Sequence, residues 1–326
     1  MKSRTLGRTG FRVSEIGIGT WQVGGKWGDP FDADLADRIL DQAAELGITF
    51  IDTADVYSDG LSEQAVGRAL KRHPGRFHFA TKCGRRISPH VSAGYTPQKL
   101  RGFVEDSLKR IGVEALDLVQ LHCPPTEVFY RPEIFETFDR LKQEGKVLNL
   151  GVSVEKVEEG LKALEYANVA SIQVIFNLFR LRPAERLFDQ AKRKNVGIIV
   201  RVPLASGLLS GKMTAATSFG AEDHRTFNRE GAAFDKGETF SGVDFATGLK
   251  AVEELKGVFG PDLAAWALRW ILSFDAVSTV IPGASRPEQV ALNVGAAKLP
   301  APSGRQRKAA AAVYDKYIRQ PVHHLW

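Results

Sequence analysis

Three apolar segments of the sequence end next to side chains that can exchange or orient a proton. Asp52 ends the first segment and Tyr57 follows in a polar loop, while Lys82 and His122 end the other two. A nearby ammonium stabilises a phenolate and lowers the pKa of a tyrosine, which is ~10 in water. A carboxylate keeps such a lysine charged, and a histidine can bind and orient a substrate oxygen. Each residue alone has an ordinary structural role, but the four together suit a proton donor for carbonyl reduction.

The four side chains can meet only if the strands that carry them are parallel neighbours, because active sites of parallel α/β proteins lie at the carboxyl ends of strands. Apolar strands alternate with helical segments along the chain. Eight such units favour a closed TIM (β/α)8 barrel over a doubly wound sheet. No repeat or low-complexity linker interrupts residues 1–326, so we expect one domain. The expected strands are 15–19, 49–52, 77–82, 116–122, 147–152, 171–176, 196–202 and 278–281.

Three further features surround the predicted barrel. A turn at 7–10 between short extended segments predicts an N-terminal β-hairpin. The first helix is expected over 32–46, with Asp34 as a possible cap. Residues 203–245, after the seventh strand, are too long for a plain connection, so we expect this loop to order or close over a bound ligand.

Composition excludes several classes of function. The chain has 326 residues and a net charge of +6, but Lys and Arg are interleaved with acids, so we expect no nucleic-acid partner. Cys83 and Cys123 cannot build a disulfide framework or a zinc cluster, and we expect both behind the site as small apolar residues. The pair His323–His324 has no acid or thiol cluster nearby in sequence, so no metal site is expected. No apolar segment suggests a signal peptide or a membrane span, which predicts a cytoplasmic protein.

A Rossmann-type nucleotide site can be tested directly. The segment 17–22 follows a strand, but Gln22 stands where the third glycine of that motif belongs, and no helix is expected to open there. A nucleotide must therefore be held in another way.

With Asp52, Tyr57, Lys82 and His122 at its strand ends, the chain resembles the aldo-keto reductase family. The resemblance covers nearly the whole chain, from 16–21 to 281–285, and its strongest carriers are 50–57, 80–82, 117–122 and 203–212. It implies a TIM-like barrel that binds a nicotinamide cofactor without a Rossmann fold and acts on a small carbonyl or alcohol substrate. It also implies Tyr57 as the general acid, Lys82 and Asp52 as the pair that tunes it, and His122 as the residue that orients the carbonyl.

The resemblance also implies a cofactor site, and NADP(H) is favoured while NAD(H) stays possible. Ser153 and Gln173 match the family's contacts to the nicotinamide amide, and Arg201 stands where the family usually stacks an aromatic ring. Residues 204–212 match the pyrophosphate loop, and 283–293 match the adenosine segment, in which Arg286 would bind the 2′-phosphate. The full expected set is Thr20, Trp21, Asp52, Ser153, Gln173, Arg201, Pro203, Leu204, Ser206, Gly207, Leu209, Lys212, Gly283, Ser285, Arg286, Gln289 and Asn293.

Four positions depart from the family's commoner pattern. Val154 replaces an asparagine, Arg201 an aromatic residue, Gln289 an arginine and Leu292 a glutamate. A second class of function also stays open, because some relatives are cofactor-bound subunits of potassium channels. The natural substrate and the oligomeric state cannot be predicted from the sequence, since specificity lies in loops that carry no local code.

Overall fold

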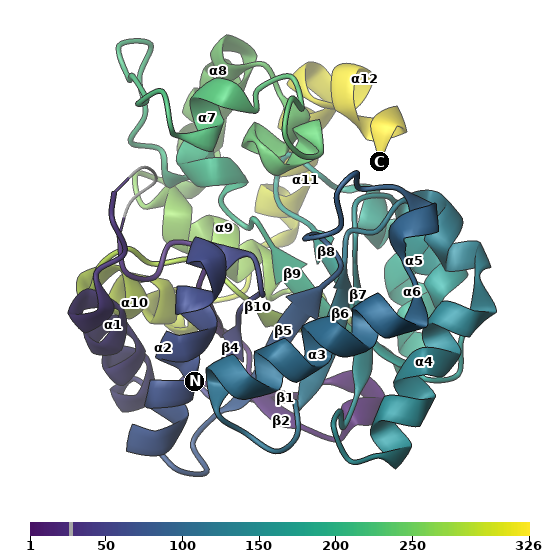
Figure 1. Ribbon diagram of the computed structural model, residues 1–326. Coiled ribbons are helices and arrows are strands. Elements are labelled where there is room, and N and C mark those ends of the chain that lie inside the picture. The colour runs from purple at the N-terminus through teal and green to yellow at the C-terminus, as the bar shows by residue number, and fades with distance from the viewer. Residues whose placement is uncertain (26–28) are drawn as a thin grey trace.

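The computed structural model describes residues 1–25 and 29–326, and its centre is one parallel sheet of eight strands. Neighbouring strands follow chain order, and the bridges Ile16–Val280 and Gly19–Gly283 join the first strand to the last. The sheet therefore closes into the predicted (β/α)8 barrel, which is confirmed (Figure 1). The strands are β3 Ile18–Gly19, β4 Phe50–Asp52, β5 His78–Cys83, β6 Leu118–His122, β7 Leu150–Val154, β8 Val169–Ile175, β9 Gly197–Arg201 and β10 Val277–Val280.

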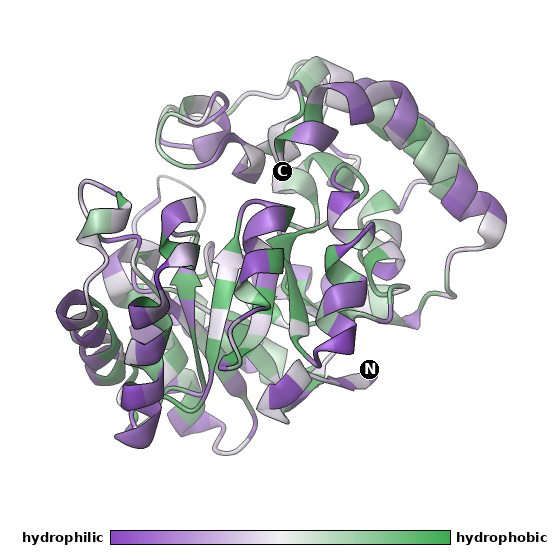
Figure 2. Cartoon of the chain, turned by 90° about the vertical axis from the view of Figure 1, so that its right-hand side faces the viewer, coloured by the Kyte–Doolittle hydropathy of each residue, from purple (hydrophilic) through white to green (hydrophobic). Residues whose placement is uncertain are grey.

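Helices surround the barrel and turn their apolar faces toward it, as the hydropathy colours of Figure 2 show. They are α1 Ala33–Glu45, α2 Leu61–Arg72, α3 Pro97–Ile111, α4 Pro132–Gln143, α5 Val157–Ala163, α6 Leu187–Arg193, α7 His224–Phe227, α8 Phe245–Phe259, α9 Leu263–Ile271, α10 Pro287–Gly295, α11 Gly304–Tyr317 and α12 Arg319–Val322.

Local sequence sets where these helices begin and end. Thr96 caps α3 by accepting from Lys99 N, Pro97 occupies its first turn, and Gly112 ends it in the left-handed conformation. The cap predicted for α1 was wrong. Asp32, not Asp34, accepts from Leu35 N at 2.9 Å, because Asp32 has the extended backbone of a cap whereas Asp34 already lies in the first helical turn.

The predicted N-terminal hairpin forms and closes the amino-terminal end of the barrel. Strands β1 Ser3–Thr5 and β2 Arg12–Ser14 pair antiparallel, and Leu6 between them is fully buried in a cluster with residues of the barrel interior. Gly7 approaches β9 so closely that a Cβ there would lie 2.1 Å from Gly197 N. The opposite, carboxyl-terminal end of the strands is thus the end left for a site (Figure 1).

The long segment 203–245 lies across that carboxyl-terminal end and is more ordered than the sequence suggested. It contains 3-10 turns at Ala205–Ser210, Lys236–Glu238 and Phe240–Gly242 as well as α7. The side chain of Asn228 accepts from Ala233 N and Phe234 N, both at 2.9 Å, which fixes one bend of the segment. Among the described residues, no helix is long and apolar enough to cross a membrane.

Candidate active site

The four residues predicted to exchange or orient a proton meet at the carboxyl end of the barrel. Lys82 Nζ, buried at the end of β5, donates to Asp52 Oδ1 at 2.5 Å, to Thr53 O at 2.8 Å and to Tyr57 Oη at 3.2 Å. The ring of His122 lies edge-on to that of Tyr57, with 5.9 Å between centroids. All three ammonium protons therefore have acceptors, and one of these acceptors is the phenol oxygen.

The carboxylate of Asp52 is held by more groups than the sequence indicated. Gln120 Nε2 donates to Oδ2 at 3.1 Å and Gln173 Nε2 donates to the same oxygen at 2.7 Å. Thr20 fixes the backbone, because its N–H and hydroxyl both donate to Asp52 O, at 2.9 and 3.0 Å. Gln173, expected at the nicotinamide amide, thus already uses its amide nitrogen within the protein.

Burial changes the proton affinities of the site, and one direction differs from the prediction. Burial raises the pKa of Tyr57, and the charge of Lys82 offsets only part of that effect, so the phenol is protonated. Burial alone would lower the pKa of Lys82, but Asp52 and Tyr57 raise it. Burial, with Arg85 and Lys82, holds the pKa of His122 well below its usual value, and its Nδ1 has no hydrogen-bond partner among the described residues. The site therefore presents a neutral phenol and a neutral imidazole beside a charged lysine.

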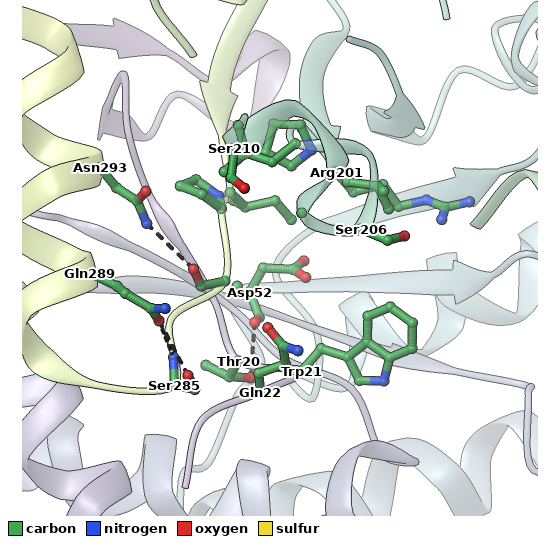
Figure 3. A pocket seen from close by; sticks show the side chains of 18 of the residues that line it. Thr20, Trp21, Gln22, Asp52, Arg201, Ser206, Ser210, Ser285, Gln289 and Asn293 are labelled. Carbon is green, nitrogen blue, oxygen red and sulfur yellow. Dashed lines mark hydrogen bonds between the residues drawn. The ribbon is translucent and has the colours of Figure 1, made fainter. Parts of the chain in front are cut away.

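A cavity of about 480 Å³ begins at these residues and runs outward between the long segment and α10. Tyr57 and His122 line its inner end, and Figure 3 shows Asp52 and Trp21 on the same wall. The predicted residues on its wall are Thr20, Trp21, Asp52, Gln173, Arg201, Pro203, Leu204, Ser206, Gly207, Lys212, Gly283, Ser285, Arg286, Gln289 and Asn293; Gln22, Ser210, His224, Arg225 and Glu238 also line it and were not predicted.

The outer end of the cavity lies at the start of α10. Gln289 Oε1 accepts from Ser285 N at 2.7 Å and from its hydroxyl at 3.3 Å, which fixes the turn before the helix (Figure 3). Asn293 Nδ2 donates to Gly283 O at 3.4 Å on the same side. Arg286 is exposed on the cavity wall and forms no ion pair with any described residue. An available cation thus lies where the 2′-phosphate was predicted.

The middle of the cavity is bordered by the 3-10 turn after β9. Ala205 and Ser206 have φ of 47° and 55°, and Gly207 follows at 92°. The N–H groups of Gly207 and Leu209 donate to Leu204 O, at 2.9 and 3.1 Å. The pyrophosphate loop was expected to bind phosphate through backbone N–H groups, but these two N–H groups are already used inside the turn. Leu209 itself is fully buried, and Lys212 is the exposed cation at this part of the wall.

Two residues near β7, Ser153 and Cys123, have surroundings that the sequence did not indicate. Ser153 is fully buried and does not line the cavity, and its hydroxyl lies 3.4 Å from Cys123 Sγ. Cys123 has φ of 47°, which turns the chain out of the extended geometry that was assumed and directs the thiol toward Ser153 and Arg201 Nη2, also at 3.4 Å. Both cysteines are buried away from the cavity wall, as expected, but only Cys83 belongs to the main apolar core.

A buried ionic cluster, which the sequence did not reveal, lies beside the inner end of the cavity. Arg201 Nη2 donates to Glu155 Oε1 at 2.8 Å and its Nη1 lies 3.5 Å from Glu238 Oε2. Arg85 also pairs with Glu238. Burial raises the pKa of Glu155 to about 8, whereas Arg85 and Arg201 overcome burial and lower the pKa of Glu238 to about 2. Arg201 is therefore held by the carboxyl groups of Glu155 and Glu238 at the cavity wall.

The same cluster contains a set of potential metal ligands. Ligand atoms of Cys123, Glu155 and Glu238 lie within 4.8 Å of one another. Glu238 is already paired with two guanidinium groups, and burial raises the pKa of Glu155 and of the thiol, so the set does not fit a divalent cation.

Comparisons with known proteins agree with this geometry. The model of the aldo/keto reductase family matches residues 15–309. The uncharacterized oxidoreductase YqkF of Bacillus subtilis (strain 168) is 32% identical over 302 residues, which cover 91% of each chain. The NADH-specific methylglyoxal reductase of Escherichia coli (strain K12) is 28% identical over 313 residues, covering 91% of this chain and 93% of that protein. The solved structure of the glycerol dehydrogenase AKR11B4 from Gluconobacter oxydans has a TM-score of 0.79 and 30% identity, covering 100% of this chain and 98% of that one.

A closed parallel barrel with these similarities defines an oxidoreductase. The match extends over most of the sequence and over nearly the full length of these relatives. The chain belongs to the aldo/keto reductase family.

Proposed function

We propose that this protein reduces aldehydes or ketones with NADPH, and that Tyr57 donates the proton. The observation that carries the proposal is the contact of 3.2 Å between Tyr57 Oη and a buried Lys82 at the inner end of the cavity. A neutral phenol can release a proton at the moment of reaction if a positive charge is ready to stabilise the phenolate that remains. Lys82 supplies that charge and Asp52 keeps it in place.

The reaction divides between a cofactor and the residues of the chain. The nicotinamide supplies a hydride to the carbonyl carbon when the cofactor is bound. Tyr57 gives its proton to the carbonyl oxygen, so that a C–H and an O–H bond form as the C=O double bond becomes single. His122, kept neutral by burial, can donate a hydrogen bond to the same oxygen and orient it. The remaining phenolate is stabilised by the ammonium of Lys82.

Exposed cations along the cavity support a dinucleotide as its ligand. Its inner end holds Tyr57 and Gln173, its middle is the turn after β9, and its outer end is the start of α10. Lys212 and Arg286 are exposed cations without ion pairs to the described residues, and we propose that they bind the pyrophosphate and the 2′-phosphate. Arg286 is the reason to propose NADP(H) rather than NAD(H). Arg201, held by the carboxyl groups of Glu155 and Glu238, would offer the face of its guanidinium to the nicotinamide.

The proposed substrates are small carbonyl compounds or, in the reverse direction, the matching alcohols. Trp21 lies 6.1 Å from Tyr57 between ring centroids and gives this end of the cavity an aromatic wall. We also propose that the chain forms a single domain and that it acts in the cytoplasm. Ser153 and Leu209 are left out of the proposed site, because their side chains do not reach the cavity wall.

The test is a calorimetric titration with NADPH and with NADH, followed by steady-state oxidation of the preferred cofactor against a panel of aldehydes. We expect tighter binding of NADPH and measurable turnover. Preference for NADH would contradict the assignment of Arg286. Tight cofactor binding without turnover on any aldehyde or ketone would favour the alternative of a cofactor-bound regulatory subunit.

A further inference from the structure

Trp326, the last residue of the printed sequence, is an anchor for one turn of the long segment. It is 5% exposed, and its indole N–H donates to Asp235 Oδ1 at 2.8 Å. The guanidinium of Arg180, which follows β8, lies 4.2 Å from the centroid of the ring. A tryptophan that is buried, hydrogen-bonded and covered by a cation fixes the groups around it. Figure 1 places this end of the chain on the same side of the barrel as α7.

The backbone of the turn 235–242 packs directly on the indole. A Cβ added to Gly242 would lie 2.3 Å from the ring, and one added to Gly237 would lie 2.9 Å from it. Gly242 also has φ of 76°, which side chains rarely adopt. Because no side chain separates the turn from the ring, a substitution of Trp326 removes a packing contact of the turn backbone itself.

The same turn carries part of the cavity wall. Phe240 N donates to the hydroxyl of Ser206 at 3.1 Å, and this hydroxyl donates to Glu238 O at 3.0 Å. The carboxylate of Glu238 pairs with Arg85 and Arg201 across the barrel end. Ser206 and Glu238 both line the cavity, so the turn links Trp326 to two of its wall residues.

The wall needs such support because its backbone is unfavourable by itself. Ala205 and Ser206 are left-handed, and so are Phe240 and Ser241, with φ of 51° and 58°. Non-glycine residues keep this conformation only where surrounding structure holds it. One support is Asn177, whose amide donates to Ser241 Oγ at 2.8 Å. Trp326 supports the same turn from its outer side.

We propose that Trp326 is a positioning residue for the cofactor: it holds the turn 235–242 and thereby keeps Ser206 and Glu238 in the cavity wall. The inference rests on the proposed function, since NADPH is the ligand that the cavity is proposed to take. When a site is formed in only part of the molecules, its apparent Kd rises by the inverse of that fraction. With the indole removed, we expect the turn to be in place in about a tenth of the molecules, and hence a Kd for NADPH about tenfold higher.

The experiment measures NADPH binding by isothermal titration calorimetry for the wild type, Trp326→Ala and Trp326→Phe. We expect about a tenfold rise in Kd for Trp326→Ala and a smaller rise for Trp326→Phe, which keeps a ring but loses the donor to Asp235. Turnover at saturating NADPH should stay within about twofold of the wild type, because the hydrogen bonds that hold Tyr57, Lys82 and Asp52 come from groups outside the turn. Without cofactor, trypsin should cleave Trp326→Ala faster than the wild type after Arg229 and Lys236.

Matched variants separate positioning from a loss of stability. Asp235→Ala removes the acceptor of both the indole N–H and Gly237 N, whereas Asp235→Asn keeps an oxygen there, so only the alanine variant should raise the Kd. Phe135→Leu disturbs a ring stacked on Tyr166 at 3.7 Å, between α4 and the end of α5, and should change neither the Kd nor the cleavage of the loop. If Trp326→Ala does not fold, the two Asp235 variants decide the question.

The outcomes distinguish this inference from the proposed function. A wild-type protein that binds neither NADPH nor NADH would overturn the function itself. A wild type that binds NADPH while Trp326→Ala and Asp235→Ala bind it equally well would overturn only the role of Trp326. A fall in turnover with unchanged Kd would also contradict it, because it would show damage to the chemistry rather than to the cofactor loop.

Discussion

The substitution Tyr57→Phe removes one oxygen from the centre of the proposed site, and the structure indicates how much activity depends on it. Neither neighbour can supply the proton instead. Lys82 Nζ also donates to Asp52 and to Thr53 O, and the low pKa of His122 keeps its ring neutral. General acid catalysis is typically worth about 10²- to 10⁴-fold, and without a substitute donor we expect the upper part of that range. A loss of about 10³- to 10⁴-fold corresponds to about 4 to 5.5 kcal/mol of transition-state stabilisation.

The assay is steady-state reduction of several aldehydes at saturating NADPH, with the Kd for NADPH measured by calorimetry. Turnover should collapse while the Kd changes by less than about twofold, since the phenyl ring still packs beside Trp21. Tyr95→Phe serves as the control, because its hydroxyl bonds His90 at 2.9 Å and does not line the cavity. Near wild-type rates in Tyr57→Phe, with NADPH bound, would refute the proposed mechanism whatever the fold.

Three further predictions follow from charges around the site. Lys82→Met should reduce turnover and move the upper pH limit of activity to higher pH, because the phenol loses the charge that lowers its pKa; a pH profile of kcat checks this. Arg286→Ala should weaken NADPH by about ten- to hundredfold and NADH hardly at all, whereas Lys212→Ala should weaken both alike in calorimetry. Burial raises the pKa of Asp55 from 3.8 to about 7, so its stabilising contribution is complete below pH 3.8 and is lost as the pH rises through about 7. Asp55→Asn should therefore be more stable than the wild type at pH 8, by up to about 4 kcal/mol, but not at pH 4, in urea unfolding.

The barrel and the inner site could be predicted because both depend on short-range pattern. Each apolar run ends at the residue that carries the chemistry, and chain order makes parallel strands neighbours. Asp52, Lys82 and His122 therefore had to lie side by side once the strands were placed. Gln120 was missed although a signal existed. It stands two residues before His122, so both side chains point to the same face of β6, and a polar residue there needs a buried partner.

The ionic cluster could not be predicted, because its members are far apart in sequence and share no local pattern. Arg85 and Glu238 are 153 residues apart. In the sequence, nothing distinguishes Glu155 from any other acidic residue before a helix. The direction of the Cys123 side chain was predicted wrongly for a local reason. The prediction assumed that the strand stays extended through residue 123, whereas the chain turns left-handed there, which no residue type at that position indicates.

Chemistry and cofactor binding thus rest on different kinds of structure in this chain. Of the proposed proton-transfer groups, Asp52, Lys82 and His122 stand on strand ends whose geometry is fixed by the sheet, and Tyr57 follows β4 in a short turn. Lys82 therefore reaches Tyr57 without help from the long segment. The wall around Ser206 instead depends on left-handed backbone held by distant contacts, including that of Trp326 with Asp235. Perturbing the barrel end should therefore change turnover at saturating cofactor, and perturbing the segment should change cofactor affinity. A loop variant that alters turnover without altering affinity would show that the two parts are not separable in this way.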